Sequence, residues 1–290
     1  MDSRALIAVA LAAGASACAG QERIAGEPGW KLVWHDEFSG EGPVDECDWV
    51  YEQGFVRNQE LQWYAPENVR REDGVLLLES RRERRANPNF ESGSKDWRRS
   101  REFGEFTSGS IKTHGLHEWL YGRFELKARI DTRPGLWPAF WTVGTARPWP
   151  GCGELDIMEY FRGTLLANAA WASPKSGAAV WDASTTPLAQ LAGDYSDDRD
   201  DGIGAWSSRF HVWRMDWDAE RTRFFVDGRL LNEVDVARAR NDSPDRALPF
   251  REPQHVILNL AIGGTAGGDP SATEFPARFE VDWVRVWQRE

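Results

Sequence analysis

Three carboxylates stand within six residues in the stretch Glu154-Leu155-Asp156-Ile157-Met158-Glu159, inside an apolar run typical of a buried β-strand. Burying a charge costs free energy unless the charge is paired or used, and the hexapeptide contains no basic residue. Carboxylates this close repel one another, so at least one should keep its proton near neutral pH. A protonated carboxyl beside an ionised one is what an acid catalyst working with a carboxylate nucleophile requires.

The five-residue interval between the two glutamates predicts a β-bulge. In a regular strand Glu154 and Asp156 share one face and Glu159 points the opposite way. A bulge at Ile157-Met158 adds one residue and returns Glu159 to the first face. The glutamates are then about four strand steps apart, ~13 Å between Cα atoms. Side chains that lean inward bring the carboxyl groups to ~5–6 Å. Retaining glycosidases need about 5–5.5 Å and inverting enzymes roughly 6.5–9.5 Å, so the spacing favours a retaining glycosidase.

Two other interpretations of the hexapeptide are an exposed acidic strand and a calcium loop. An exposed edge would not usually carry leucine, isoleucine and methionine between its acids. The usual calcium loop has a glycine at its sixth position and oxygen ligands on alternate residues, unlike this stretch. We therefore prefer catalysis.

The length and composition are those of one large β domain with more tryptophans than a core alone needs. The 290-residue chain has 16 tryptophans, of which some should build the core and others could stack on sugar faces in a groove. Its net charge of −11 argues against a nucleic-acid partner, which needs a basic surface. We expect one catalytic domain over residues 30–290, acting as a monomer.

The N-terminal residues predict export. An alanine-rich apolar run at 5–17 is too short to span a bilayer and is typical of a signal peptide, here residues 1–18. Cys18 follows small residues, so the sequence leaves open a lipid anchor on this cysteine. Residues 19–29 would form a tether. We expect the protein in the periplasm, outside the cell or lipid-anchored on a bacterial envelope.

Strand-like runs recur along the chain without a long helical pattern, which predicts a two-sheet β-sandwich. The Asp227-Gly228 pair between two apolar runs predicts a hairpin. Cys47 and Cys152 should be free, buried thiols, although they could pair in an oxidising compartment. The runs lie at 31–34, 75–78, 121–130, 223–226, 229–231, 255–261 and 279–287.

Two charged segments interrupt this pattern. Residues 81–101 carry eight Arg or Lys against three acids, and residues 194–204 are rich in aspartate. Both are typical of surface loops. The first could also form a basic lip that meets an anionic polysaccharide.

Several motifs, in order, make the chain resemble family 16 of the glycoside hydrolases, in the branch with laminarinases, agarases and carrageenases. The resemblance implies an all-β, concanavalin-like jelly-roll sandwich with a cleft on its concave sheet. It also implies an endo-acting enzyme, with a β-1,3-glucan of laminarin type as the first candidate substrate. The motifs are 34–38 (WHDEF), 135–141 (GLWPAFW), 149–160 (WPGCGELDIMEY), 259–264 (NLAIGG), 275–276 (FP) and 281–287 (VDWVRVW).

The resemblance implies roles for the three acids. Glu154 would be the nucleophile, Glu159 the acid/base, and Asp156 would lie between them and adjust the charge of the nucleophile. No cofactor is implied for catalysis. A structural calcium, which the family often carries, would be bound by Glu37, the Gly74 carbonyl and Asp282.

The same comparison implies sugar-binding residues. Trp137 and Trp141 would shape the sites beside the scissile bond, with core packing as the alternative. Asn58 and Trp63 would lie near the non-reducing side, and Asn168 and Trp171 would contact sugar on the other side.

Departures from the family pattern leave the sugar open. Ser110 stands where an arginine is common, and residues 166–171 replace a histidine-glycine segment found in many laminarinases. Hydrolysis of sulfated algal galactans, transglycosylation and non-catalytic sugar binding are therefore kept as alternatives.

Overall fold

A computed structural model describes residues 24, 26–173, 176, 178–193, 202–241 and 247–290. The predicted signal peptide with Cys18, part of the 19–29 tether and residues 194–201 of the acidic segment lie outside the described residues. Within the described ranges, no helix is long and apolar enough to cross a membrane.

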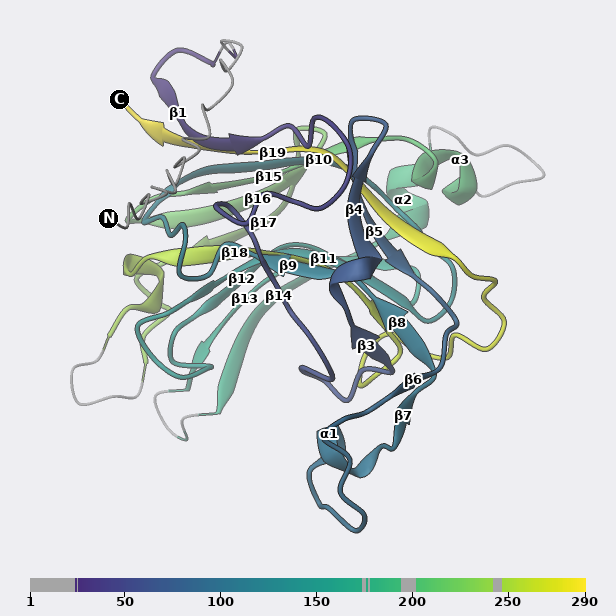
Figure 1. The fold of residues 1–290 in the computed structure, drawn as a ribbon. Coiled ribbons are helices and arrows are strands. Elements are labelled where there is room, and N and C mark those ends of the chain that lie inside the picture. Colours follow the sequence, from purple (N-terminus) through teal and green to yellow (C-terminus); the bar gives the residue numbers. More distant parts are fainter. Residues whose placement is uncertain (1–23, 25, 174–175, 177, 194–201, 242–246) are drawn as a thin grey trace, which may run out of the picture.

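Two antiparallel sheets are stacked on one another (Figure 1). The first has the strand order β17-β16-β15-β10-β19-β5-β4, and β1 also pairs with β19. Its strands are β1 (Trp30–Asp36), β4 (Val69–Glu72), β5 (Val75–Ser80), β10 (Gly122–Ile130), β15 (His211–Trp217), β16 (Arg221–Val226), β17 (Arg229–Asp235) and β19 (Ala277–Arg289).

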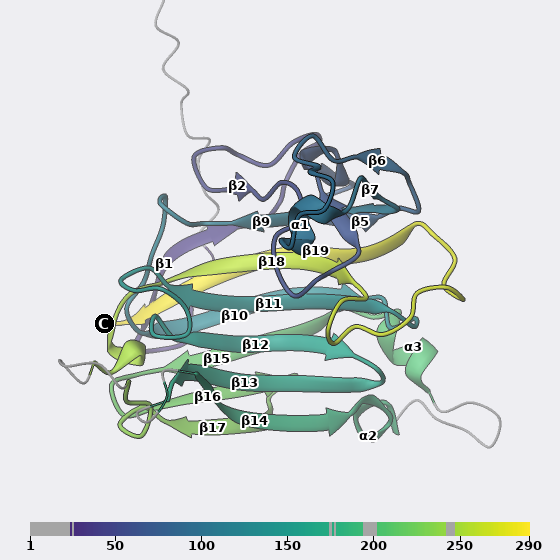
Figure 2. The same ribbon diagram turned by 90° about the horizontal axis from the view of Figure 1, so that it is seen from below.

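The second sheet has the order β14-β13-β12-β11-β18-β9-β2, and Figure 2 shows its neighbouring strands side by side. Strand β12 therefore lies between two long partners, away from both edges of the sheet. The strands are β2 (Val50–Tyr51), β9 (Ser110–Lys112), β11 (Leu136–Gly144), β12 (Glu154–Phe161), β13 (Thr164–Ala172), β14 (Ala179–Pro187) and β18 (Gln254–Ile262).

Short elements surround the two sheets. Strands β3 and β8 pair in parallel, and β6 pairs with β7 beside helix α1 (Figure 1). These elements are β3 (Gln62–Tyr64), β6 (Arg85–Ala86), β7 (Phe103–Gly104), β8 (Phe106–Ser108), α1 (Trp97–Ser100), α2 (Leu188–Ala192), α3 (Ile203–Ser207) and the 3₁₀ turns η1 (Pro66–Asn68) and η3 (Pro249–Arg251).

Local sequence explains the strands. In β10 the apolar side chains of Phe124, Leu126 and Ala128 are fully buried, and the residues between them are less buried, as the predicted alternation requires. The predicted hairpin joins β16 to β17 through Asp227 (φ 48°) and Gly228 (φ 80°). Both residues have the positive φ that a two-residue hairpin turn of this kind needs.

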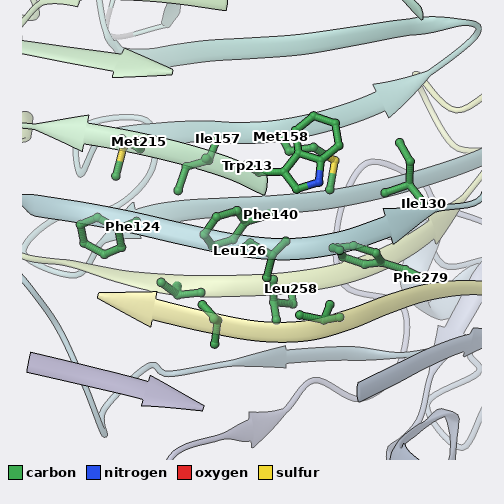
Figure 3. Packing of buried hydrophobic residues seen from close by; sticks show 14 of the residues in the cluster. Phe124, Leu126, Ile130, Phe140, Ile157, Met158, Trp213, Met215, Leu258 and Phe279 are labelled. Carbon is green, nitrogen blue, oxygen red and sulfur yellow. The ribbon is translucent and has the colours of Figure 1, made fainter. Parts of the chain in front are cut away.

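One hydrophobic core fills the space between the sheets and confirms the predicted all-β sandwich (Figure 3). Both sheets contribute large side chains that are excluded from water, and such burial is the main favourable term in folding. The first sheet supplies Phe124, Leu126, Ile130, Trp213, Met215 and Phe279, and the second supplies Phe140, Ile157, Met158 and Leu258.

Cys47 and Cys152 do not form a disulfide with each other. Cys152 is buried, and burial raises the pKa of its thiol to about 11, so it is a poor nucleophile. Cys47 is exposed, so the prediction of a buried thiol is wrong there. Cys47 lies in the turns between β1 and β2, where its backbone N–H donates to Asp45 Oδ1 at 2.8 Å.

Replacing Phe140 with alanine should lower the free energy of unfolding by about 3–5 kcal/mol, because Phe140 is 0% exposed and its loss leaves a cavity. Urea titration of both proteins measures this difference. The control is Leu230→Ala in β17, where the side chain is 50% exposed and the change should stay below about 1 kcal/mol. Equal losses in the two variants would contradict the core described here.

Candidate active site

A cavity of ≈ 740 Å³ lies on the face of the second sheet that is turned away from the core. Three carboxylates of β12 line it, together with side chains from β11, β13, β14, β18 and helix α1 and from three loops. The lining residues are Arg57, Asn58, Glu60, Arg98, Trp137, Ala139, Trp141, Val143, Trp149, Glu154, Asp156, Glu159, Phe161, Leu166, Asn168, Trp181, Ala183, Asn259, Thr265 and Ala266.

Strand β12 contains the predicted bulge. On β11, Ala139 pairs with Glu159 and Trp141 pairs with Asp156, so two steps on β11 match three steps on β12. The same extra residue appears in the pairing of β12 with β13 between Asp156 and Glu159. Ile157 and Met158 are both 0% exposed in the core, and all three carboxylates line the cavity. The bulge thus returns Glu159 to the face of Glu154.

An indole N–H donates to each glutamate. Trp137 Nε1 donates to Glu159 Oε1 at 2.8 Å, and Trp149 Nε1 donates to Glu154 Oε2 at 2.8 Å. Indole is a donor only, so both contacts stabilise the ionised carboxylate. Each glutamate is therefore fixed in orientation by a ring that also lines the cavity.

The two glutamates have raised pKa values. Burial is the main cause for Glu159, the nearby charge of Glu154 adds to it, and together they raise its pKa to about 7 although Trp137 opposes them. Burial also raises the pKa of Glu154, and the Trp149 indole and the Arg57 charge pull it back. Near neutral pH, Glu159 can therefore hold a proton while Glu154 is ionised.

The surroundings of Asp156 favour its protonated form. Its burial, followed by the charges of Glu159 and Glu154, raises its pKa well above the usual range. Its Oδ2 atom is buried and has no hydrogen-bond donor among the described residues. A proton on Asp156 would give this carboxyl a hydrogen-bond partner, because it could then donate to Glu154. That hydrogen bond lowers the pKa of Glu154.

Polar groups on the 57–60 loop form one wall. Arg57 is paired with Glu52, whose burial would favour the neutral acid but whose pKa falls to about 2 beside Arg57 and Lys112. The Arg57 guanidinium also lies 5.2 Å from the ring centre of Trp141. Glu60 is buried and accepts from Gln62 Nε2 at 2.7 Å, and burial raises its pKa. The charged side chains of this wall, Arg57 and Glu60, are thus each bonded to a polar partner, Glu52 and Gln62 respectively.

The structure brings four of the six predicted sugar-binding residues to the cavity, namely Trp137, Trp141, Asn58 and Asn168. Trp141 Nε1 donates to Asn259 Oδ1 at 2.8 Å, which fixes the ring. Asn168 Oδ1 accepts from the Ser184 backbone N–H at 3.2 Å.

The other two predicted sugar-binding residues, Trp63 and Trp171, do not line the cavity. Trp63 is buried in a small cluster with Phe55 and Ala65, and its ring meets Phe55 edge-on. Trp171 belongs to the core and meets Phe250 edge-on. It follows Asn168 by three residues on β13, and strand alternation puts such residues on opposite faces. Neither ring is available to sugar in this arrangement.

Two exposed tryptophans of the cavity were not predicted. Trp149, in the loop before β12, is 53% exposed, and Trp181 on β14 is 46% exposed. Exposed rings of this size beside a cavity are typical of binding surfaces. Trp181 and Ala183 point to the same face of β14, and both line the cavity. Strand alternation therefore identifies Trp181 as a cavity residue as soon as it is known which residues of β14 face the cavity.

The predicted calcium ligands do not fit a metal here. Both carboxylate oxygens of Glu37 accept from Arg285, at 2.9 and 2.8 Å, and Asp282 is paired with Lys127 at 2.7 Å. Gly74 closes the turn between β4 and β5 with φ 76°. In the described residues, no group of three or more His, Cys, Asp or Glu could hold a metal ion. The two predicted carboxylate ligands are thus each paired with a cation of the chain.

Comparisons with known proteins agree with this geometry. The profile of Glycosyl hydrolases family 16 matches residues 57–285. The chain is 35% identical over 289 residues to a beta-glucanase of Rhodothermus marinus, covering 93% of this chain and 89% of the relative. It is 31% identical to a glucan endo-1,3-beta-glucosidase of Cryptopygus antarcticus, covering 89% and 92%.

A solved structure from work on endo-acting O-glycanases, which human gut microbiota use to initiate mucin breakdown, superposes with a TM-score of 0.79 at 32% identity. It covers 91% of this chain and 92% of that one. Together with the carboxylates of β12, these matches show that the chain belongs to glycosyl hydrolase family 16 and is an O-glycosyl hydrolase.

Proposed function

We propose that the protein is an endo-acting, retaining hydrolase of β-1,3-glucans. The observation that carries this proposal is the bulge in β12, which places Glu154, Asp156 and Glu159 on one face of the cavity. Relatives that match most of the chain are named beta-glucanase and glucan endo-1,3-beta-glucosidase, which supports the substrate class.

In the first step Glu159 donates its proton to the glycosidic oxygen as the bond to the anomeric carbon breaks. Glu154 attacks that carbon and forms a glycosyl-enzyme ester. In the second step Glu159, now ionised, takes a proton from water as the water oxygen attacks the same carbon and releases Glu154. Two inversions leave the configuration of the sugar unchanged.

Asp156 acts on Glu154 through a hydrogen bond. While the nucleophile is ionised, the protonated Asp156 shares its hydrogen with Glu154 and stabilises the negative charge. This contact also keeps a third negative charge out of the buried site, because an ionised Asp156 would repel both glutamates.

The aromatic rings suit an uncharged chain of sugars. Trp137 and Trp141 lie on β11 beside the catalytic strand, and the exposed Trp149 and Trp181 lie farther out. Flat apolar rings bind the apolar faces of sugars by burying surface from water. Four rings around one cavity support binding of several sugar units, as an endo-acting enzyme requires.

A β-galactoside or mucin-type glycan is the second candidate substrate. The O-glycanase structure superposes with a TM-score of 0.79, and Ser110 replaces an arginine expected of a laminarinase. Here Ser110 Oγ donates to Glu52 Oε2 at 2.8 Å and helps to hold the partner of Arg57. Transfer to a second sugar instead of water would use the same three acids, and product chain lengths separate it from hydrolysis.

We also propose that the protein is exported, because residues 5–17 have the composition of a signal-peptide core. The intact mass of the mature protein tests this, with a start at or near Cys18 as the expected result. A mass that includes residues 1–17 would contradict export. Diacylglycerol mass on Cys18 would show the lipid anchor.

Wild-type protein should release reducing ends from laminarin, and Glu154→Gln and Glu159→Gln should each lose at least about 10²–10⁴-fold in kcat. The control is Glu220→Gln, whose side chain is 80% exposed and distant in sequence from the site. Unfolding curves show whether each variant is folded. Full activity in either catalytic variant would contradict the assignment of Glu154 and Glu159 as the catalytic residues.

Azide separates the two roles in alanine variants assayed on an aryl β-glycoside. It should enter the space left in Glu154→Ala and give an α-glycosyl azide by a single inversion. In Glu159→Ala it should attack the glycosyl-enzyme and give a β-glycosyl azide. The opposite pair of products would exchange the roles of the two glutamates.

The plot of kcat/KM against pH should fall on its basic side near pH 7, because Glu159 must be protonated to act as an acid and its pKa is about 7. Trp137→Phe removes a donor that favours the ionised form, so it should raise this pKa and move the basic limb to higher pH. The control is Trp141→Phe, whose indole donates to Asn259 and which should leave the limb in place. If the basic pKa of the profile shifts equally in both variants, or falls in Trp137→Phe, then Glu159 is not the acid that this profile reports.

A further inference from the structure

A second cavity, of ≈ 520 Å³, lies directly beside the catalytic one. The two cavities share Thr265, whose backbone N–H donates to the Asn58 carbonyl at 2.9 Å. Asn58 lines the catalytic cavity and the next residue, Gln59, lines the second. A substrate chain that leaves the catalytic cavity over this ridge would therefore enter the second one.

Two arginines, Arg101 and Arg162, line this second cavity, which we call the arginine pocket. Arg101 donates to the backbone carbonyls of Gln59 at 2.9 Å and of Glu60. A carbonyl holds the guanidinium in place but does not cancel its charge. Burial, with no compensating anion, lowers the pKa of Arg101, yet an arginine stays protonated.

Arg162 lies at the exposed turn between β12 and β13. No carboxylate of the described residues lies within ion-pair distance of Arg162 or Arg101. Three other arginines at 81–101 have carboxylate partners, since Arg81 pairs with Glu79, Arg85 with Glu67 and Arg99 with Glu91. The arginine pocket therefore keeps positive charge in a protein of net charge −11.

The predicted basic lip is a folded part of the chain that positions Arg101. The buried Asn87 side chain donates to the carbonyls of Arg98 at 2.8 Å and Arg101 at 2.7 Å. Arg98 in turn donates to the Val56 carbonyl at 3.0 and 2.7 Å and lines the catalytic cavity. Its exposed neighbour Asp96 lies 3.6 Å away. One segment thus brings cations to both cavities.

One carboxylate opposes these charges. Asp269 lines the arginine pocket, fully exposed, and its two oxygens accept from the backbone N–H and hydroxyl of Ser271 at 2.9 and 2.8 Å. Two cations against one anion leave a net positive pocket. Guanidinium groups present paired N–H donors that match the oxygens of a sulfate or carboxylate group.

We propose that the arginine pocket binds an anionic substituent, a sulfate ester or a carboxylate, carried by the polysaccharide beyond the sugars in the catalytic cavity. This inference rests on the proposed function and adds to it a preference for β-1,3-glucan chains that bear such groups over neutral chains. Arg101 and Arg162 bind the anion, and Asp269 limits the strength of that binding.

Calorimetry on the inactive Glu154→Gln protein tests the pocket. The ligands are β-1,3-gluco-oligosaccharides of equal length that are neutral, sulfated or carboxymethylated. We expect at least one anionic form to bind about tenfold more tightly than the neutral one at low salt, as charge-assisted contacts allow. The ratio of neutral to anionic Kd should shrink as salt screens the charges.

Three further substitutions are made in the Glu154→Gln protein. Arg162→Asn should lower the ratio of neutral to anionic Kd, Asp269→Asn should raise this ratio, and Arg84→Gln should leave it unchanged. Asparagine suits the turn because Arg162 has φ 50°, which asparagine adopts readily. Arg84 is 62% exposed, belongs to the same basic segment and lines neither cavity. A ratio near one, or any other pattern in the three variants, overturns the anion site. Binding of none of the oligosaccharides overturns the proposed function as well.

Discussion

The bulge at Ile157 and Met158 satisfies two requirements that compete in a regular strand. The core needs apolar side chains from β12, and the cavity needs Glu159 on the same face as Glu154. Strict alternation would bury Glu159 and expose Met158. One extra residue lets two successive apolar side chains enter the core and then returns the strand to the cavity face. The strands on both sides, β11 and β13, absorb the shift in their pairing, so the catalytic geometry depends on the whole centre of the sheet.

Three acids on one buried face would be unstable if all were ionised. The site lowers the charge by keeping protons on Asp156 and Glu159 and stabilises the remaining negative charge with neutral donors. Indole groups are suited to this because they donate without titrating. Arg57 in the cavity wall lowers the pKa of Glu154, and its pairing with Glu52 offsets part of its positive charge. Without that pairing, the charge of Arg57 would favour the ionised form of Glu154 more strongly.

The sequence alone predicted the bulge, the carboxylate face, the sandwich and the Asp227-Gly228 hairpin, because each depends on residues close together in the chain. It failed where a side chain is placed by distant residues. Trp171 was assigned to sugar although its odd spacing from Asn168 puts it in the core. Glu37 and Asp282 were predicted as calcium ligands from family motifs alone. Their partners Arg285 and Lys127 are distant in sequence from Glu37 and Asp282 respectively, so these ion pairs are seen only in the fold. The basic segment was noticed from its composition, but its anchoring on backbone carbonyls could not be predicted.

The exposure of Trp149 has a consequence for how the enzyme responds to occupancy. Trp149 is 53% exposed, so its ring contacts water while its indole N–H donates to Glu154. A sugar that covers the ring excludes that water and strengthens the remaining hydrogen bond, since the local dielectric constant falls. Filling the cleft therefore makes Glu154 a better-ordered anion at the moment when its carbon target arrives. The same event makes the surroundings of this indole less polar, so binding and ordering of the nucleophile occur together.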